Sequence, residues 1–161
     1  MLRSGDKAPD FVLPDEQGRD TSLQDLLADG PLILYFYPAD FTPVCTKEAC
    51  TIRDLHDDIA AVGLRVAGVS PQDAATHARF RAEHDLPFTL LCDTAKTAIR
   101  DYDVVGPFGA GVRRVTYLIS EDGTIRDAVL ADLRVARHEE LIRKVVDLRD
   151  AAGYRDRHSA G

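Results

Sequence analysis

The segment YPADFTPVCTKEAC, residues 37–50, carries two of the three cysteines of the chain, Cys45 and Cys50. A deprotonated cysteine is a strong nucleophile, and a thiol loses its proton more readily at the N-terminus of a helix or beside a cationic side chain. Thr42 and Pro43 precede Cys45 and are typical of the N-cap and the first position of a helix. The segment therefore predicts a preorganised thiolate in the first turn of a helix.

The interval of five residues between Cys45 and Cys50 is unusual for two cooperating thiols. It is wider than the C-x-x-C interval of thiol-disulfide oxidoreductases. In an intact helix, five residues advance ~7.5 Å and turn ~140°, which separates the two Cα atoms by roughly 8.6 Å. Because a disulfide requires a Cα separation of about 4.4–6.8 Å, we expect this pair to bond only if the first turns of the helix unwind.

The elements around this segment predict an α/β fold in a single domain of residues 1–152. The apolar run at 31–37 is typical of a strand buried on both faces, and it leads directly into the helix expected at 43–61. Active sites of α/β sheets lie at the carboxyl ends of strands, where this arrangement places Cys45. The other expected elements are a hairpin around 15–20, helices at 22–30, 73–84, 94–102 and 136–152, strands at 64–70, 88–92, 113–120 and 124–130, and a loop at 106–111.

The composition is that of an ordinary globular protein, with 45% hydrophobic and 29% charged residues in 161. A formal charge of -7 argues against general affinity for nucleic acid or anionic membranes. The N-terminus has no apolar signal segment, and the longest apolar run is far below the ~20 residues of a membrane span, so we expect a cytoplasmic protein. The five histidines show no metal-ligand spacing with the cysteines, and residues 153–161 are expected to fray.

Pro38, Thr42 and Cys45 form the pattern P-x-x-x-T-x-x-C, which resembles the signature of the peroxiredoxins. The surrounding YFYP and CTKEAC are similar to the bacterioferritin comigratory protein branch, also called PrxQ, and the similarity extends from the N-terminal GDKAPDF to Arg114. This resemblance implies a thioredoxin-like fold, in which helices flank a central mixed sheet, with an N-terminal β-hairpin extension. It also implies a thiol peroxidase that needs no cofactor and no metal.

The resemblance assigns roles to individual residues. Cys45 would be the peroxidatic cysteine, whose thiolate attacks the O–O bond of a hydroperoxide and becomes a sulfenic acid. Thr42 would hydrogen-bond the peroxide or the thiolate, and the backbone N–H groups of Val44 and Cys45 would contact the peroxide oxygens. Arg114 would stabilise the thiolate and the developing oxyanion, and Glu48 would orient Arg114.

Three residue assignments have alternatives. Arg113 competes with Arg114, and since neighbours on a strand face opposite sides, only one of them should reach the site. Cys50 is the resolving cysteine of the family scheme, with a plain core residue as the alternative. Cys92 is expected to be structural, with an accessory redox thiol as the alternative.

The resulting prediction is an atypical two-cysteine peroxiredoxin that reduces hydrogen peroxide and organic hydroperoxides and is recycled by a thioredoxin-like reductant. The expected partners are the hydroperoxide and the reductant, without nucleic acid or membrane, and the expected state is a monomer, with a weak dimer as the alternative. A peroxide-sensing relay that uses the same thiol is the second hypothesis, and a thiol-disulfide oxidoreductase is the third. Phe41 and Phe108 are expected to make the peroxide pocket apolar.

Overall fold

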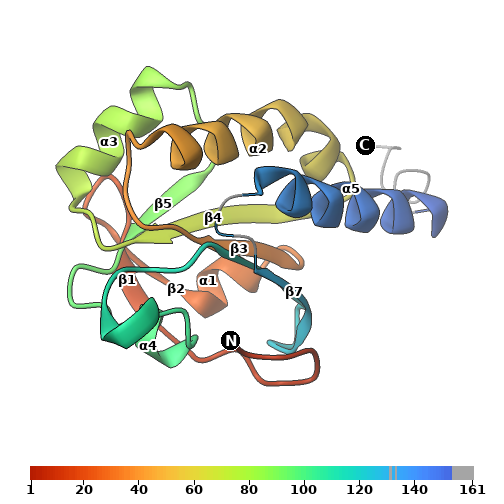
Figure 1. Cartoon of the computed structure of the whole chain (residues 1–161). Helices are drawn as coiled ribbons and strands as arrows, with labels where there is room; N and C mark the ends of the chain where they lie inside the picture. The colour runs from red at the N-terminus through yellow and green to blue at the C-terminus, as the bar shows by residue number, and fades with distance from the viewer. Residues whose placement is uncertain (131, 133, 154–161) are drawn as a thin grey trace.

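A five-stranded mixed sheet forms the centre of the computed structural model, which describes residues 1–130, 132 and 134–153 (Figure 1). The central strand pairs in parallel with one neighbour and antiparallel with the other, which confirms the expected mixed α/β sheet. In spatial order the strands are β5 (Thr89–Cys92), β4 (Arg65–Ser70), β3 (Leu32–Phe36), β6 (Val115–Ile119) and β7 (Ile125–Leu130).

The central strand β3 divides the hydrophobic core into two halves. All five of its residues are buried, and alternate side chains enter opposite halves because successive residues of a strand face opposite sides. Helices cover both faces of the sheet, as Figure 1 shows. One face carries α2 (Pro43–Ala61), α3 (Ala74–Glu83) and α5 (Val135–Ala151), and the other carries α1 (Leu23–Leu27) and α4 (Thr97–Asp101).

Helix α2 begins and ends where the sequence predicts. Thr42 is its N-cap with extended backbone angles, and Pro43 occupies the first turn, where its missing N–H group leaves no helical hydrogen bond unmade. The Thr42 side chain makes no capping hydrogen bond to the helix. Cys45 and Ala49 lie on the buried face of α2, so the helix places its first cysteine against the sheet.

The N-terminal hairpin is also confirmed, as β1 (Val12–Pro14) paired antiparallel with β2 (Asp20–Ser22). Ser22 then caps α1 by accepting a hydrogen bond from the Asp25 N–H, and the Asp25 carboxylate accepts one from the Ser22 N–H. This reciprocal capping box explains why the chain turns directly from strand into helix.

One local expectation is wrong. The strand expected at 113–120 begins only at Val115, so Arg113 and Arg114 both precede β6. On the last helix, Leu148 is 61% exposed and lines a surface groove with Pro31 and Leu64.

The expected loop at 106–111 contains a short 3-10 turn, Pro107–Gly109. Residues 154–161, most of the tail expected to fray, lie outside the described residues. In the described part of the chain, every helix is too short or too polar to span a bilayer. The same residues contain no cluster of three or more His, Cys, Asp or Glu side chains that could hold a metal ion.

Candidate active site

Cys45 lies in the first turn of α2, beyond the carboxyl end of β3. Its side chain is only 1% exposed and forms no disulfide. An Nη2–H group of Arg114 points at the sulfur, with an Nη2–Sγ distance of 3.1 Å. A guanidinium at this distance stabilises a thiolate, and the N-terminal end of the helix dipole acts in the same direction.

Arg114 is held in place by Asp132, which follows β7. Its backbone N–H donates to the Asp132 carboxylate at 3.0 Å, and its Nη1–H donates to the Asp132 carbonyl at 2.6 Å. Arg113 also binds Asp132, through its own Nη2 at 3.2 Å, and its side chain is 41% exposed. Of the two arginines, the structure therefore brings Arg114 to Cys45, although not for the expected reason of alternation along a strand.

The loop before Cys45 contains the other residues of the motif. Pro38 begins it directly after Tyr37, and Thr42 ends it; both are half-buried. The Thr42 hydroxyl donates to the Ala39 carbonyl at 3.3 Å, so it stabilises the turn of the loop. Val44, which directly precedes Cys45, is also half-buried.

Phe41 adopts a left-handed backbone conformation, with φ of 63°. This conformation is strained for a residue other than glycine, and the contacts of the ring offset the strain. The ring packs edge-on against Phe80 of α3, with centroids 5.1 Å apart, and Arg79 lies 6.0 Å from its centre. The expected apolar pocket lined by both Phe41 and Phe108 is not formed, because Phe41 packs on α3 and Phe108 is fully exposed to solvent.

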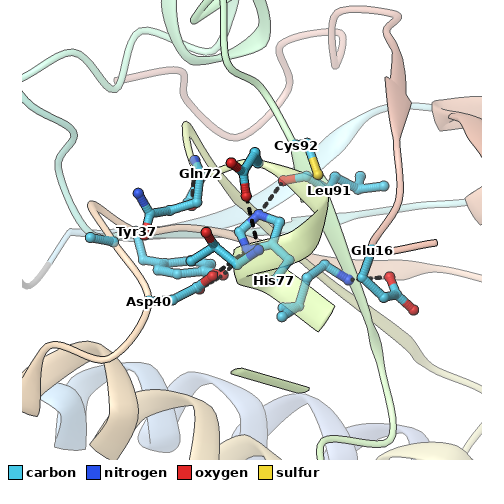
Figure 2. Close-up of polar contacts among 12 residues, drawn as sticks. Glu16, Tyr37, Asp40, Gln72, His77, Leu91 and Cys92 are labelled. Carbon is cyan, nitrogen blue, oxygen red and sulfur yellow. Dashed lines mark hydrogen bonds and ion pairs between the residues drawn. The ribbon is translucent and has the colours of Figure 1, made fainter. Parts of the chain in front are cut away.

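A buried polar network holds the base of the loop (Figure 2). The Asp40 carboxylate accepts a hydrogen bond from the Tyr37 hydroxyl at 2.6 Å and pairs with Nδ1 of His77 at 2.5 Å. Nε2 of His77 lies 3.0 Å from the Leu91 carbonyl oxygen, so both ring nitrogens have partners. The side chains of Asp40 and His77 are completely buried. This network ties the loop to α3 and β5, and the sequence analysis missed it.

Glu48 lies one turn after Cys45, with an exposed fraction of 1%. Burial raises the pKa of its carboxyl to about 8, although the charge of Arg114 acts in the opposite direction. Nε2 of His138 lies 3.8 Å from the carboxylate, and Nδ1 of the same ring is 2.8 Å from the Thr116 hydroxyl. Among the described residues, neither Glu48 oxygen has a hydrogen-bond partner, so Glu48 does not orient Arg114 through a hydrogen bond.

Cys50 is half-buried on the side of α2 that faces the end of α3. Its sulfur lies 3.8 Å from Nδ1 of His84, the C-cap of α3. Arg53, one turn further along α2, donates to the His84 carbonyl at 2.8 Å. Cys50 and Cys45 are both free thiols in the described structure.

Cys92 ends β5 in a different environment. Its side chain is 5% exposed, and its thiol lies 3.7 Å from the Asp15 carbonyl, to which it donates. Burial, followed by the charges of surrounding carboxylates, raises the pKa of this thiol to about 11. The thiol therefore stays protonated near neutral pH, which favours the structural interpretation over an accessory redox role.

Comparison with known proteins agrees with this geometry. Residues 4–128 match the model of the AhpC/TSA family. The chain is 42% identical to peroxiredoxin bcp of Coxiella burnetii over 85% of its own length and 93% of that protein. It is 40% identical to chloroplastic peroxiredoxin Q of Arabidopsis thaliana over 78% of its own length and 58% of that protein.

Solved structures extend the similarity to the fold. Peroxidoxin BcpB of Mycobacterium tuberculosis superposes with a TM-score of 0.86 at 33% identity, covering 92% of this chain and 98% of that one. The bacterioferritin comigratory protein of Xanthomonas campestris, studied for alkyl peroxide reduction, has a TM-score of 0.76 at 28% identity, with coverage of 88% and 91%. The expected thioredoxin-like fold with its N-terminal hairpin is therefore confirmed.

Proposed function

The chain belongs to the AhpC/TSA family, and we propose that its Cys45 reduces hydroperoxides and that Cys50 completes the cycle. Within this family it belongs to the peroxiredoxins of the bacterioferritin comigratory protein and PrxQ type, which are thiol-dependent peroxidases. The observation that supports this assignment most directly is the 3.1 Å contact between Arg114 Nη2 and Cys45 Sγ at the N-terminus of α2.

In the peroxide step, the Cys45 thiolate attacks one oxygen of the hydroperoxide. The S–O bond forms as the O–O bond breaks, the leaving oxygen departs as water or an alcohol after protonation, and Cys45 becomes a sulfenic acid. Arg114 stabilises the thiolate before the attack and the developing oxyanion during it. Its double anchorage on Asp132 keeps the guanidinium in position without help from α2.

The loop before Cys45 supplies the remaining groups around the peroxide. The backbone N–H groups of Val44 and Cys45 lie in the first turn of α2, where N–H groups have no helical acceptor and are free to bind the peroxide oxygens. The Thr42 hydroxyl can hydrogen-bond the peroxide once it rotates away from the Ala39 carbonyl. Pro38 restricts the backbone at the start of the loop. Glu48 lines the buried side of the site as a carboxyl group that burial keeps largely protonated at neutral pH.

In the resolution step, Cys50 attacks the sulfenic acid and forms a disulfide with Cys45. The intact helix keeps the two residues too far apart for this bond, so the first turns of α2 unwind. The exposed disulfide is then reduced by thiol exchange with a thioredoxin-like dithiol protein. This exchange requires a reducing compartment, and the cytoplasm provides one.

Substrates of this site are small hydroperoxides, either hydrogen peroxide or alkyl hydroperoxides. The 1% exposure of Cys45 limits access to small molecules as long as α2 is wound. The Xanthomonas relative was studied for alkyl peroxide reduction, which supports including organic hydroperoxides for this chain. We propose that the protein acts as a monomer, since all the residues of the two steps come from one chain.

The test is mass spectrometry after one equivalent of hydrogen peroxide, combined with turnover on thioredoxin, thioredoxin reductase and NADPH. The wild type should form a Cys45–Cys50 disulfide and consume NADPH continuously, Cys45→Ser should do neither, and Cys50→Ser should stop at sulfenic or sulfinic acid after one turnover. Cys92→Ser is the matched control and should behave as wild type. A Cys50→Ser variant that cycles normally would contradict the two-cysteine scheme, and one oxidation without turnover would favour a peroxide sensor.

A further inference from the structure

His84 lies between Cys50 and the loop that leads to Cys45. Its Nδ1 atom is 3.8 Å from Cys50 Sγ, and its ring centroid is 6.4 Å from that of Phe41. Phe80 packs edge-on against the same ring at 5.1 Å and fixes its orientation. The imidazole therefore contacts both of the segments that must approach one another when the disulfide forms.

A cationic side chain lies close to Cys50. Arg53 lies one turn away on α2 and donates to the His84 carbonyl, so its guanidinium is held on the side of the sulfur. The pKa of Arg53 is raised by its hydrogen bond to Asp54 and further by the charges of Cys50 and Asp85.

The sheet also contributes a titratable side chain near Cys50. The residue that interacts with Cys50 from β3 is Tyr35, whose pKa is raised first by its complete burial and then by nearby acidic groups that include Cys50. Tyr35 is therefore neutral near pH 7 and does not compete for the proton. Among the described groups that act on Cys50, His84 is the one that places a nitrogen able to accept a proton against the sulfur.

We propose that His84 is the general base of the resolution step, an inference that depends on the proposed role of Cys50. The imidazole takes the proton of the Cys50 thiol, and the thiolate attacks Sγ of the Cys45 sulfenic acid. The S–S bond forms, the S–O bond breaks, and hydroxide leaves with the bonding electrons and takes a proton from the imidazolium to become water. The sulfenic acid supplies the oxidising equivalent, so the step needs no other reactant.

The position of His84 in the fold suits this role. It caps the C-terminal end of α3 and so lies outside α2, whose first turns unwind in the proposed cycle. Helix α3 is in turn attached to the base of the active-site loop through the His77–Asp40 pair. The base therefore stays beside the loop while Cys50 moves towards Cys45, and it is available for both proton transfers.

The test measures the two steps separately by quenched flow with mass spectrometry, after one equivalent of hydrogen peroxide. His84→Gln should leave the rate of sulfenic acid formation unchanged and slow disulfide formation by ~100-fold near pH 7, the low end of what a positioned base contributes. His56→Gln is the matched control, because His56 is a histidine of α2 without a contact to either cysteine in the described structure, and it should behave as wild type. In His84→Gln the disulfide step should rise steeply with pH, since thiolate then forms only by loss of the proton to solvent, and the wild-type rate should be flatter.

Several results would overturn the proposal. Disulfide formation at the wild-type rate in His84→Gln, or an equal slowing of both steps, would exclude a base acting on Cys50. His84→Phe keeps the aromatic packing, so a normal rate in this variant would assign His84 to packing alone.

A measurement without peroxide addresses the same point. Alkylation of Cys50 at pH 7 should be faster in the reduced wild-type protein than in reduced His84→Gln, and equal rates would count against the proposal. A wild type that forms no Cys45–Cys50 disulfide would contradict the proposed function instead.

Discussion

Two buried carboxylate–histidine pairs involve residues that flank Cys45 in the chain, Asp40 before it and Glu48 after it, and they differ in how many of their polar atoms have hydrogen-bond partners. Asp40 and His77 are in contact at 2.5 Å, and both side chains have further hydrogen-bond partners. Glu48 and His138 are 3.8 Å apart, and the Glu48 oxygens accept no hydrogen bond from any described residue. Both pairs are buried, but the Asp40 carboxylate accepts hydrogen bonds and the Glu48 carboxylate accepts none from the described residues.

The difference separates the part of the site that must stay fixed from the part whose charge can change. Buried polar groups are tolerated when their polar atoms are hydrogen-bonded, as they are around Asp40. Asp40 and His77 therefore hold the start of the loop to α3 in one conformation. The unsatisfied carboxyl of Glu48 instead takes up a proton, which removes a negative charge from the neighbourhood of Cys45 at neutral pH.

The largest expected effect is the loss of stability in Asp40→Ala. This change leaves His77 buried without its carboxylate partner and should lower the free energy of unfolding by about 3–5 kcal/mol. Urea unfolding at pH 7 measures the loss, and Asp57→Ala, which removes an exposed carboxylate of α2, is the control. A loss below about 1 kcal/mol, typical of an exposed pair, would show that the Asp40 network does not hold the loop.

Glu48→Gln should give a smaller effect of opposite sign. The folded-state pKa of about 8 lies above the ordinary value of 4.5, so the folded protein retains a proton that the unfolded chain loses. Wild-type stability relative to Glu48→Gln should therefore fall as the pH rises from 4.5 to 8 and stay level above that range. At the upper end the variant should be more stable by about 2–4 kcal/mol. This is less than the ~5 kcal/mol that the pKa difference corresponds to, because the amide that replaces the carboxyl is also buried without hydrogen-bond partners.

Thermal or urea unfolding across this pH range checks the prediction, with Glu140→Gln on the exposed side of α5 as the control. A difference between wild type and Glu48→Gln that does not change with pH would mean that Glu48 titrates normally. It would then be ionised near neutral pH.

The smallest effects should come from removing the one hydroxyl group that contacts each pair, Tyr37 beside Asp40 and Thr116 beside His138. Tyr37→Phe deletes a hydrogen bond to a carboxylate and should cost about 2 kcal/mol, whereas Thr116→Val deletes one to an imidazole and should cost about 1 kcal/mol. Urea midpoints measured at one pH give both values. Equal losses, or a larger loss in Thr116→Val, would remove the distinction between a satisfied and an unsatisfied pair.

Local signals explain which parts of the site could be predicted. The start of α2 follows from Thr42 and Pro43, whose backbone preferences act within a few residues. The position of Cys45 in the first turn follows from that start. The contact with Arg114 is correct, but it rested on the resemblance to the peroxiredoxins, and the supporting argument from strand alternation was wrong because β6 begins only after Arg114.

The polar partners could not be predicted, because their contacts connect distant parts of the chain. Asp40 and His77 are 37 positions apart, and periodicity indicates which residues are buried without indicating which polar groups meet. Asp132 lies between β7 and α5, where no motif marks it as the anchor of Arg114. His84 follows a short helix with a weak apolar face, so neither its aromatic contacts nor its contact with Cys50 had a signal in the sequence.

The anchorage of Arg114 outside α2 makes the winding of that helix depend on the oxidation state of Cys45. The attraction between guanidinium and sulfur exists when the helix is wound and the sulfur is a thiolate, and a sulfenic acid or disulfide carries no charge to sustain it. Oxidation therefore shifts the equilibrium of the first turns towards the unwound state, by the free energy of that one contact. By thermodynamic reciprocity, a contact that keeps α2 wound also stabilises the thiolate, and the coupling free energy is the same in both directions. The conformational equilibrium of α2 and the ionisation of the sulfur are therefore linked.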